Sequence, residues 1–298
     1  MYWTLSEINR PDHQREHIEL ALQIVLWILS EFWIDEREYD PKNIIFIDSC
    51  SRYLGRNTVW NITEIDISSS FDISTYIHEI VHAFSRYEYD DSQGRVITKL
   101  WYQSTVWFFE NRSDNRITWT TYETHRRGFN EGITDLITLD AVRQNINRIE
   151  ALKEKYKKIM EEYEKLYQST NHPKANIFGL WCQRTWWKTW YRSEMRLVTA
   201  IVDLIAYKRA GKAWDTDRYK DDVWTDLVFW YFTNNYTILK SLLKEADSSW
   251  KLNDTIEELY PRQSQTEKII AEIRTQIQTV FNPRYRLSPI PKKLKKAL

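Results

Sequence analysis

The sequence is poor in cysteine and carries no net charge, and each shortage excludes a class of protein. Only Cys50 and Cys182 occur among 298 residues, which excludes a disulfide framework and a cysteine-rich metal site and suits a reducing cytoplasm. Lysine and arginine total 42, as do aspartate and glutamate, so overall positive charge cannot drive nucleic-acid binding, and we expect no nucleic-acid partner. Hydrophobic residues make up 42% of the chain, so we expect it to fold.

Long hydrophobic runs are also missing. The most apolar stretch, residues 18–34, is interrupted by Glu19, Gln23 and Glu31, so it is too polar and too short to span a bilayer and predicts an amphipathic helix instead. The N-terminal residues show no basic region followed by an apolar core, so we predict no secretory signal and a cytoplasmic location.

Glycine is scarce where tryptophan is abundant, with 6 glycines against 15 tryptophans, although average glycine usage is roughly 7%. Four tryptophans, Trp186, Trp187, Trp214 and Trp250, stand in sequences where turns favour glycine. This pattern favours glycine codons, created by reassignment of a stop codon, that have been translated as tryptophan. The alternative is an aromatic-rich surface, whose cluster at residues 181–191 would bind a ligand by stacking or pack in a core.

Hydrophobic periodicity predicts an α+β protein. Apolar residues at helical spacing predict helices over residues 12–32, 72–87, 129–145, 149–166, 194–209, 226–244 and 264–281. Short apolar or alternating runs predict strands over residues 43–48, 58–67, 95–109 and 116–122, the last two as a hairpin. We therefore expect a zincin-like N-terminal half, in which a small sheet backs the helix at 72–87, and a helical C-terminal half.

Composition divides the chain into three parts. Residues 1–145 form the expected catalytic subdomain, residues 146–283 a helical subdomain that closes the cleft, and residues 284–298 a basic tail rich in proline and lysine. The heptad-like segment 149–166 is too short for an oligomerising coiled coil, so an intramolecular helical hairpin is favoured. The sequence leaves the oligomeric state open.

One helix carries a metal-binding pattern, His78-Glu79-Ile80-Val81-His82. Histidines four residues apart project from the same side of a helix and can chelate one zinc ion, with the glutamate as a general base. At 100° per residue these three side chains lie opposite an apolar sector, which contains Ile73, Tyr76, Ile77, Ile80, Val81 and Phe84. The helix is thus expected to pack on one side and bind zinc on the other.

A second motif supplies the ligand that two histidines lack. Residues 130–135 read Asn-Glu-Gly-Ile-Thr-Asp, and with the first motif they resemble the gluzincin zinc metallopeptidases. That resemblance implies Glu131 as third zinc ligand and Asp135 as the carboxylate that hydrogen-bonds the free nitrogen of His78 and fixes its tautomer. The separation of His82 from Glu131 is longer than in thermolysin-like gluzincins and closer to that of lethal-factor-like proteases. Gly132 would let the two helices approach closely.

The resemblance also implies the chemistry. Glu79 is the expected general base in peptide-bond hydrolysis. Gluzincins usually stabilise the oxyanion with a tyrosine or histidine beyond the third ligand, and Tyr191 is the first candidate, followed by His172, Tyr122 and His125. A packed aromatic at the start of a helix is an equally good explanation of Tyr191.

We therefore predict a zinc metallopeptidase that acts on a peptide or protein substrate. One alternative is a non-catalytic protein that uses zinc as a structural clamp or forms a peptide-binding cleft, although an intact Glu79 argues against it because a structural site needs no base. The other is a helical interaction module with incidental histidines, which predicts no bound metal. Subsite preference and the choice between endopeptidase and exopeptidase activity stay open.

The composition yields a prediction about the tryptophans. If they represent glycine, the intact mass of the native protein should fall below that of the printed sequence by the difference between the two side chains at every affected position. Mass spectrometry of the native protein, read beside its coding DNA, measures this directly. A native mass that includes 15 tryptophans would contradict the reassignment.

Overall fold

The computed structural model describes the chain in segments. These are residues 2–3, 12–32, 34, 44–47, 55–57, 63–66, 73–84, 87–90, 95–100, 103–111, 117–145, 192–211, 216–233, 236–249, 251–258 and 264–287. Side chains are described in the helices, apart from a few residues mainly at their ends, and in the short connections beside them. The strands are described by their backbone alone.

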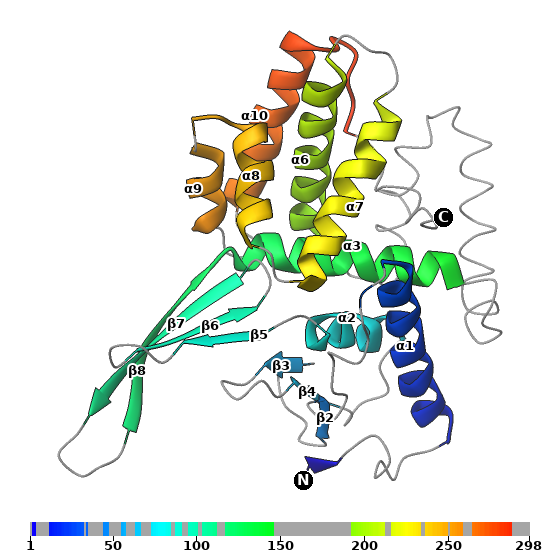
Figure 1. Cartoon of the computed structure of the whole chain (residues 1–298), viewed down its shortest axis with the longest axis vertical. Helices are drawn as coiled ribbons and strands as arrows, with labels where there is room; N and C mark the ends of the chain where they lie inside the picture. Colours follow the sequence, from blue (N-terminus) through cyan, green and yellow to red (C-terminus); the bar gives the residue numbers. More distant parts are fainter. Residues whose placement is uncertain are drawn as a thin grey trace.

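Helices build most of the molecule (Figure 1). In chain order they are α1 (Asp12–Glu31), α2 (Ile73–Ala83), α3 (Arg127–Asn145), α6 (Arg192–Ala210), α7 (Asp217–Thr233), α8 (Tyr236–Ala246), α9 (Lys251–Glu257) and α10 (Ser264–Val280). Helix α3 lies across the middle of the molecule, with α6 to α10 on one side of it and α1 and α2 on the other (Figure 1).

Short strands lie beside this helical body in two sheets. They are β1 (Tyr2–Trp3), β2 (Ile44–Ile47), β3 (Gly55–Asn57), β4 (Thr63–Asp66), β5 (Tyr87–Asp90), β6 (Arg95–Leu100), β7 (Gln103–Asn111) and β8 (Ile117–His125). The first four pair in the order β1-β2-β4-β3, with β2 and β4 parallel. The other four form an antiparallel meander, β5-β6-β7-β8, that extends away from the helices (Figure 1).

The predicted α+β class with a zincin-like sheet is wrong. The part of the chain whose packing is described is 87% helical and contains no strand or sheet, so the protein is all-α there. Every buried hydrophobic residue of the described core lies in a helix or within a few residues after the end of one. The physical reason is that long amphipathic helices bury their apolar faces against one another, so no sheet is needed to complete this core.

Helix α2 shows how the sequence pattern becomes packing. The six residues of its predicted apolar sector are all buried, from Ile73 to Phe84, which confirms the predicted division of its faces. The described core continues through α3 and α6 to α10, with Phe129, Leu197 and Trp224 among its fully buried side chains. At roughly 25 cal/mol per Å² of apolar area, such burial is the main stabilising contribution.

Most predicted helices are found close to their predicted positions, with one exception. The segment 226–244 was expected to be one helix, but the structure has α7 ending at Thr233 and α8 beginning at Tyr236. The two residues between, Asn234 and Asn235, have side chains that compete for backbone hydrogen bonds, which weakens a helix interior. The predicted helix at 149–166 lies outside the described residues.

Gly132 brings α3 against α6, so the prediction that it lets α3 approach the helix that carries His78 is wrong. A Cβ added at Gly132 would lie 2.7 Å from both the carbonyl carbon and the carbonyl oxygen of Glu194, near the start of α6. Atoms essentially never approach a real Cβ this closely, so only glycine fits. Because Gly132 follows Glu131 on α3, this contact with α6 also fixes the position of the Glu131 backbone.

The start of α3 is fixed by Arg126. This residue has a positive φ of 59°, a backbone conformation that is uncommon for residues other than glycine. Its backbone N–H donates to the carbonyl oxygen of Glu257 at 2.8 Å, and its guanidinium forms an ion pair with the carboxylate of the same residue. Helix α9 therefore sets the direction in which α3 begins.

The two tryptophans with described side chains have different surroundings. Trp224 is fully buried, whereas Trp27 is 36% exposed. The indole N–H of Trp224 has no hydrogen-bond partner among the described residues, although buried tryptophans usually find one. The four tryptophans predicted to represent glycine, Trp186, Trp187, Trp214 and Trp250, lie outside the described residues.

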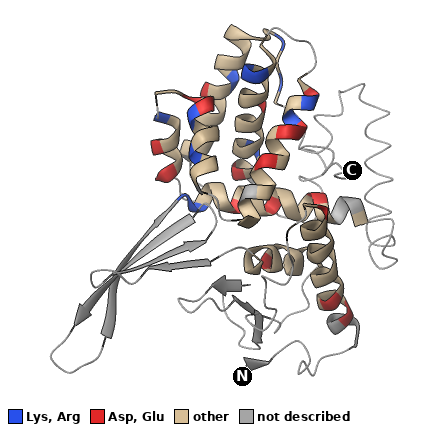
Figure 2. Ribbon diagram, in the orientation of Figure 1, with Lys and Arg blue, Asp and Glu red and all other residues tan. Residues whose placement is uncertain are grey.

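The described helices show neither a surface of one charge sign nor a membrane-spanning segment. Lysine, arginine, aspartate and glutamate are interspersed along α6 to α10 rather than separated by sign (Figure 2). No helix in the described segments has the length and apolar character needed to cross a membrane.

Substituting Gly132 tests the close contact between α3 and α6. Gly→Ala in a helix interior ordinarily stabilises by about 1 kcal/mol. Gly132→Ala should instead lower the free energy of unfolding by about 1–3 kcal/mol, because overpacking forces the backbones apart. Chemical denaturation measures the change. Gly211→Asn is the control, since nothing lies within 4 Å of a Cβ there and asparagine tolerates its positive φ. A gain in stability for Gly132→Ala would contradict the assigned contact.

Candidate metal centre

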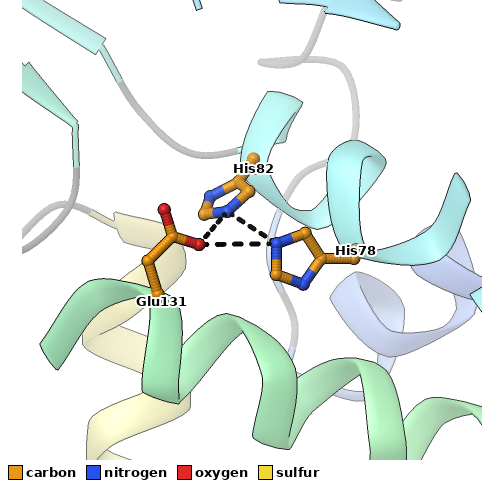
Figure 3. A group of neighbouring side chains, drawn as sticks. All are labelled: His78, His82 and Glu131. Carbon is orange, nitrogen blue, oxygen red and sulfur yellow. Dashed lines mark hydrogen bonds and ion pairs between the residues drawn. The ribbon is translucent and has the colours of Figure 1, made fainter. Parts of the chain in front are cut away.

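Three side chains from two helices meet at one point. His78 and His82 come from α2 and Glu131 from α3 (Figure 3). The two Nε2 atoms are 3.1 Å apart, and Glu131 Oε2 lies 3.2 Å from Nε2 of His82 and 3.5 Å from Nε2 of His78. Three zinc ligands at about 2.0–2.2 Å in tetrahedral geometry would stand about 3.3–3.6 Å from one another. The group could therefore hold a metal ion.

The cluster is enclosed but not sealed. The side chains of His78, His82 and Glu131 are 14%, 10% and 11% exposed. Within the described segments the group has these three members and no fourth His, Cys, Asp or Glu. Among the described residues the group therefore offers a metal ion three protein ligands and some access to solvent.

Asp135 holds the other nitrogen of His78. Its Oδ1 lies 2.8 Å from His78 Nδ1, so the ring presents Nε2 to the cluster. The structure thus places Asp135 in the contact that the sequence motif implied. A carboxylate in this position orients a ligating histidine and increases its basicity.

Burial and neighbouring charges alter the pKa values of this cluster. Burial alone would lower the pKa of His78, but the hydrogen bond and charge of Asp135, with Glu131 and Glu79, outweigh it and raise that pKa well above its usual value. Burial would raise the pKa of Glu131, but His82 and His78 hold it well below its usual range. Without a metal the cluster therefore attracts positive charge.

Glu79 belongs to the same electrostatic group. It follows His78 on α2 and is partly buried. Burial raises the pKa of its carboxyl, and the charges of His78 and His82 oppose that rise only in part. A carboxylate with a raised pKa beside two imidazoles has the character of a general base.

The candidates for oxyanion stabilisation stay predictions. Tyr191 and His172 lie outside the described residues, and Tyr122 and His125 belong to β8, where only the backbone is described. The structure therefore brings together His78, His82, Glu131 and Asp135, with Glu79 beside them, and leaves the oxyanion candidates unplaced.

Three further residues at the site were not found from the sequence. Thr134 Oγ1 lies 3.4 Å from His82 Nδ1 and 2.6 Å from the hydroxyl of Tyr231. Arg127 Nε lies 3.9 Å from Glu131 Oε1, one helical turn away. The only available signal was spacing, since Arg127 and Thr134 stand four residues before and three residues after Glu131 on α3.

Comparison of the chain with protein-family models, curated proteins and solved structures found no match. The likeness to gluzincins therefore depends on the two motifs alone, and family membership stays a prediction.

Removing the carboxylate of Asp135 tests its contact with His78. Asp135→Ala should weaken zinc binding by about 10- to 100-fold, the usual effect of losing the partner of a metal-binding histidine. Asp135→Asn should weaken it less, because an amide oxygen can still accept the hydrogen bond. Competition with a chelator measures the affinity. Glu267→Ala, which removes an exposed ion pair with Arg196, is the control, and equal affinity in Asp135→Ala would refute the role.

Proposed function

We propose that this protein is a zinc-dependent peptidase. The observation that carries the proposal is the convergence of His78, His82 and Glu131 within 3.5 Å of one another. Two neutral nitrogens and one carboxylate oxygen form the ligand set that zinc uses in catalytic sites, and the pattern of two histidines and one glutamate occurs in metallopeptidases.

The metal is identified by ligand chemistry. Magnesium and calcium prefer oxygen ligands, whereas imidazole suits zinc and other late transition metals. A bound zinc ion would polarise the scissile carbonyl and make water a stronger acid. The residues that would hold it are His78, His82 and Glu131, with Asp135 orienting His78.

Glu79 would carry the proton during hydrolysis. Its carboxylate takes a proton from the attacking water as the water oxygen bonds to the carbonyl carbon. It then gives that proton to the amide nitrogen as the C–N bond breaks, which leaves a free carboxylic acid and a free amine. Burial raises the pKa of the Glu79 carboxyl, which makes its carboxylate a better acceptor for the proton of the attacking water.

Metal analysis separates this proposal from its alternatives. Purified protein should contain about one zinc ion per chain and cleave members of a random peptide library. A helical interaction module would contain no stoichiometric metal. A structural zinc protein would contain the metal but leave every peptide intact.

Replacing the general base should separate chemistry from metal binding. Glu79→Gln removes the proton acceptor while keeping the size of the side chain, so hydrolysis should fall by a factor of about 10² to 10⁴ with zinc content unchanged. Peptide turnover and metal analysis of the same preparation measure the two effects. Glu88→Gln, on strand β5 rather than α2, is a control of the same chemistry. Unchanged turnover in Glu79→Gln would eliminate Glu79 as the base.

A further inference from the structure

We propose that Thr134 and Tyr231 are positioning residues that fix the tautomer of His82. The inference extends the metal centre of the proposed function and depends on it. Thr134 lies on α3, one turn beyond Asn130, and Tyr231 lies near the end of α7. Both side chains are fully buried. They stand on the side of His82 that faces away from the ligand cluster.

The hydroxyl of Thr134 has only one proton, and its neighbours determine where that proton goes. Thr134 Oγ1 donates to the backbone carbonyl of Asn130 at 3.0 Å. The hydroxyl of Tyr231 lies 2.6 Å from the same oxygen. With the Thr134 proton directed to Asn130, Tyr231 is the donor in this short contact, and Thr134 Oγ1 accepts it with one lone pair.

The second lone pair of Thr134 faces His82. Its Oγ1 lies 3.4 Å from His82 Nδ1, at the long end for a hydrogen bond. Since Thr134 has no proton left to give, the ring nitrogen must be the donor. His82 then carries its proton on Nδ1 and presents the lone pair of Nε2 to Glu131 and His78, as a metal ligand requires.

The two histidines are therefore held by different chemistry. His78 donates to the carboxylate of Asp135 at 2.8 Å, whereas His82 donates to a neutral hydroxyl. A second carboxylate behind His82 would add negative charge to a group that already includes Glu131, Asp135 and Glu79. A neutral partner orients the ring without adding charge, so it preserves more of the Lewis acidity of a bound cation.

This arrangement also connects α7 to the metal centre. The hydroxyl of Tyr231 contacts Thr134, a residue 97 positions away in the sequence. The C-terminal end of α7 lies beside α3 (Figure 1). Its ring is held in turn by Phe232, at 5.2 Å between centroids in an edge-to-face arrangement. The geometry of the site therefore depends on a helix that supplies no ligand.

Isosteric removal of each hydroxyl tests the proposal. Thr134→Val should weaken zinc binding by about tenfold, at the lower end of the effect of losing such a partner, and Tyr231→Phe should weaken it less. Thr134→Ser should restore wild-type affinity because it keeps the hydroxyl. Chelator competition measures affinity, and chemical denaturation of the metal-free proteins shows whether stability accounts for any change.

Matched controls come from α3 itself and from the segment that follows α10. Thr138→Val makes the same change one turn further along α3, where the residue is buried and its hydroxyl has no partner among the described residues. Tyr285→Phe removes another buried tyrosine hydroxyl, one that donates to Asp203 instead. Both controls should leave zinc affinity unchanged.

Nitrogen NMR of the wild-type protein gives a readout that needs no variant. The ¹⁵N signals of His82 in the metal-free protein should show the proton on Nδ1, and Thr134→Val should reduce that preference. Absence of a proton from His82 Nδ1 in the wild type, or equal zinc affinity in Thr134→Val and Thr138→Val, would overturn the inference. Wild-type protein that binds zinc without cleaving peptides would contradict the proposed function alone, and failure to bind zinc would overturn both.

Discussion

The structure depends on one unfavourable arrangement, in which two imidazole nitrogens and a carboxylate oxygen lie 3.1–3.5 Å apart in a largely buried place. Three electron pairs that point at one another repel, and burial deprives them of water that would relieve the repulsion. Only a positive occupant satisfies all three. The raised pKa of His78 and the lowered pKa of Glu131 have this cause, because both shifts favour positive charge on the imidazoles beside a negative carboxylate.

Helix α3 is the element that makes this arrangement possible. Glu131, Thr134 and Asp135 face α2 from consecutive turns and contact either histidine or both. On its other sides Gly132 admits α6 at backbone contact distance, and Phe129 is buried in the core. One short stretch of α3, residues 129–135, thus supplies both chemistry and packing, so stability must be measured beside metal affinity for substitutions in it.

The sequence predicted the geometry within each motif because both motifs are local, whereas the resemblance to gluzincins implied that Glu131 and Asp135 join the histidines. Histidines at i and i+4 must share a helix face, and Asp135 stands one turn after Glu131, so the geometry within each helix follows from 3.6 residues per turn. The helices themselves were predicted for the same reason, since the apolar spacing of α1 and α2 repeats every three to four residues. The end of α7 at Thr233 and the start of α8 at Tyr236 were missed because the apolar pattern continues from one helix into the next.

What sequence could not provide is long-range packing. Apolar and alternating runs at 58–67, 95–109 and 116–122 indicated strands, but a local pattern does not determine which elements share a core, and the described core is all-helical. Tyr231 was missed for a similar reason, since nothing in its neighbourhood on α7 indicates that its hydroxyl reaches α3. Such contacts depend on how helices cross, which is decided by packing of whole faces.

The position of Glu79 is what favours catalysis over a purely structural use of metal. A structural site is stable when four protein ligands close it, and a further buried carboxylate beside it only adds repulsion and desolvation cost. Here a partly buried carboxylate adjoins three ligands, and burial raises its pKa while both imidazoles oppose the change. A fold that needed the metal only for stability would gain by replacing Glu79 with an apolar residue. Under the proposed function, the transfer of a proton accounts for its presence beside the three ligands found among the described residues.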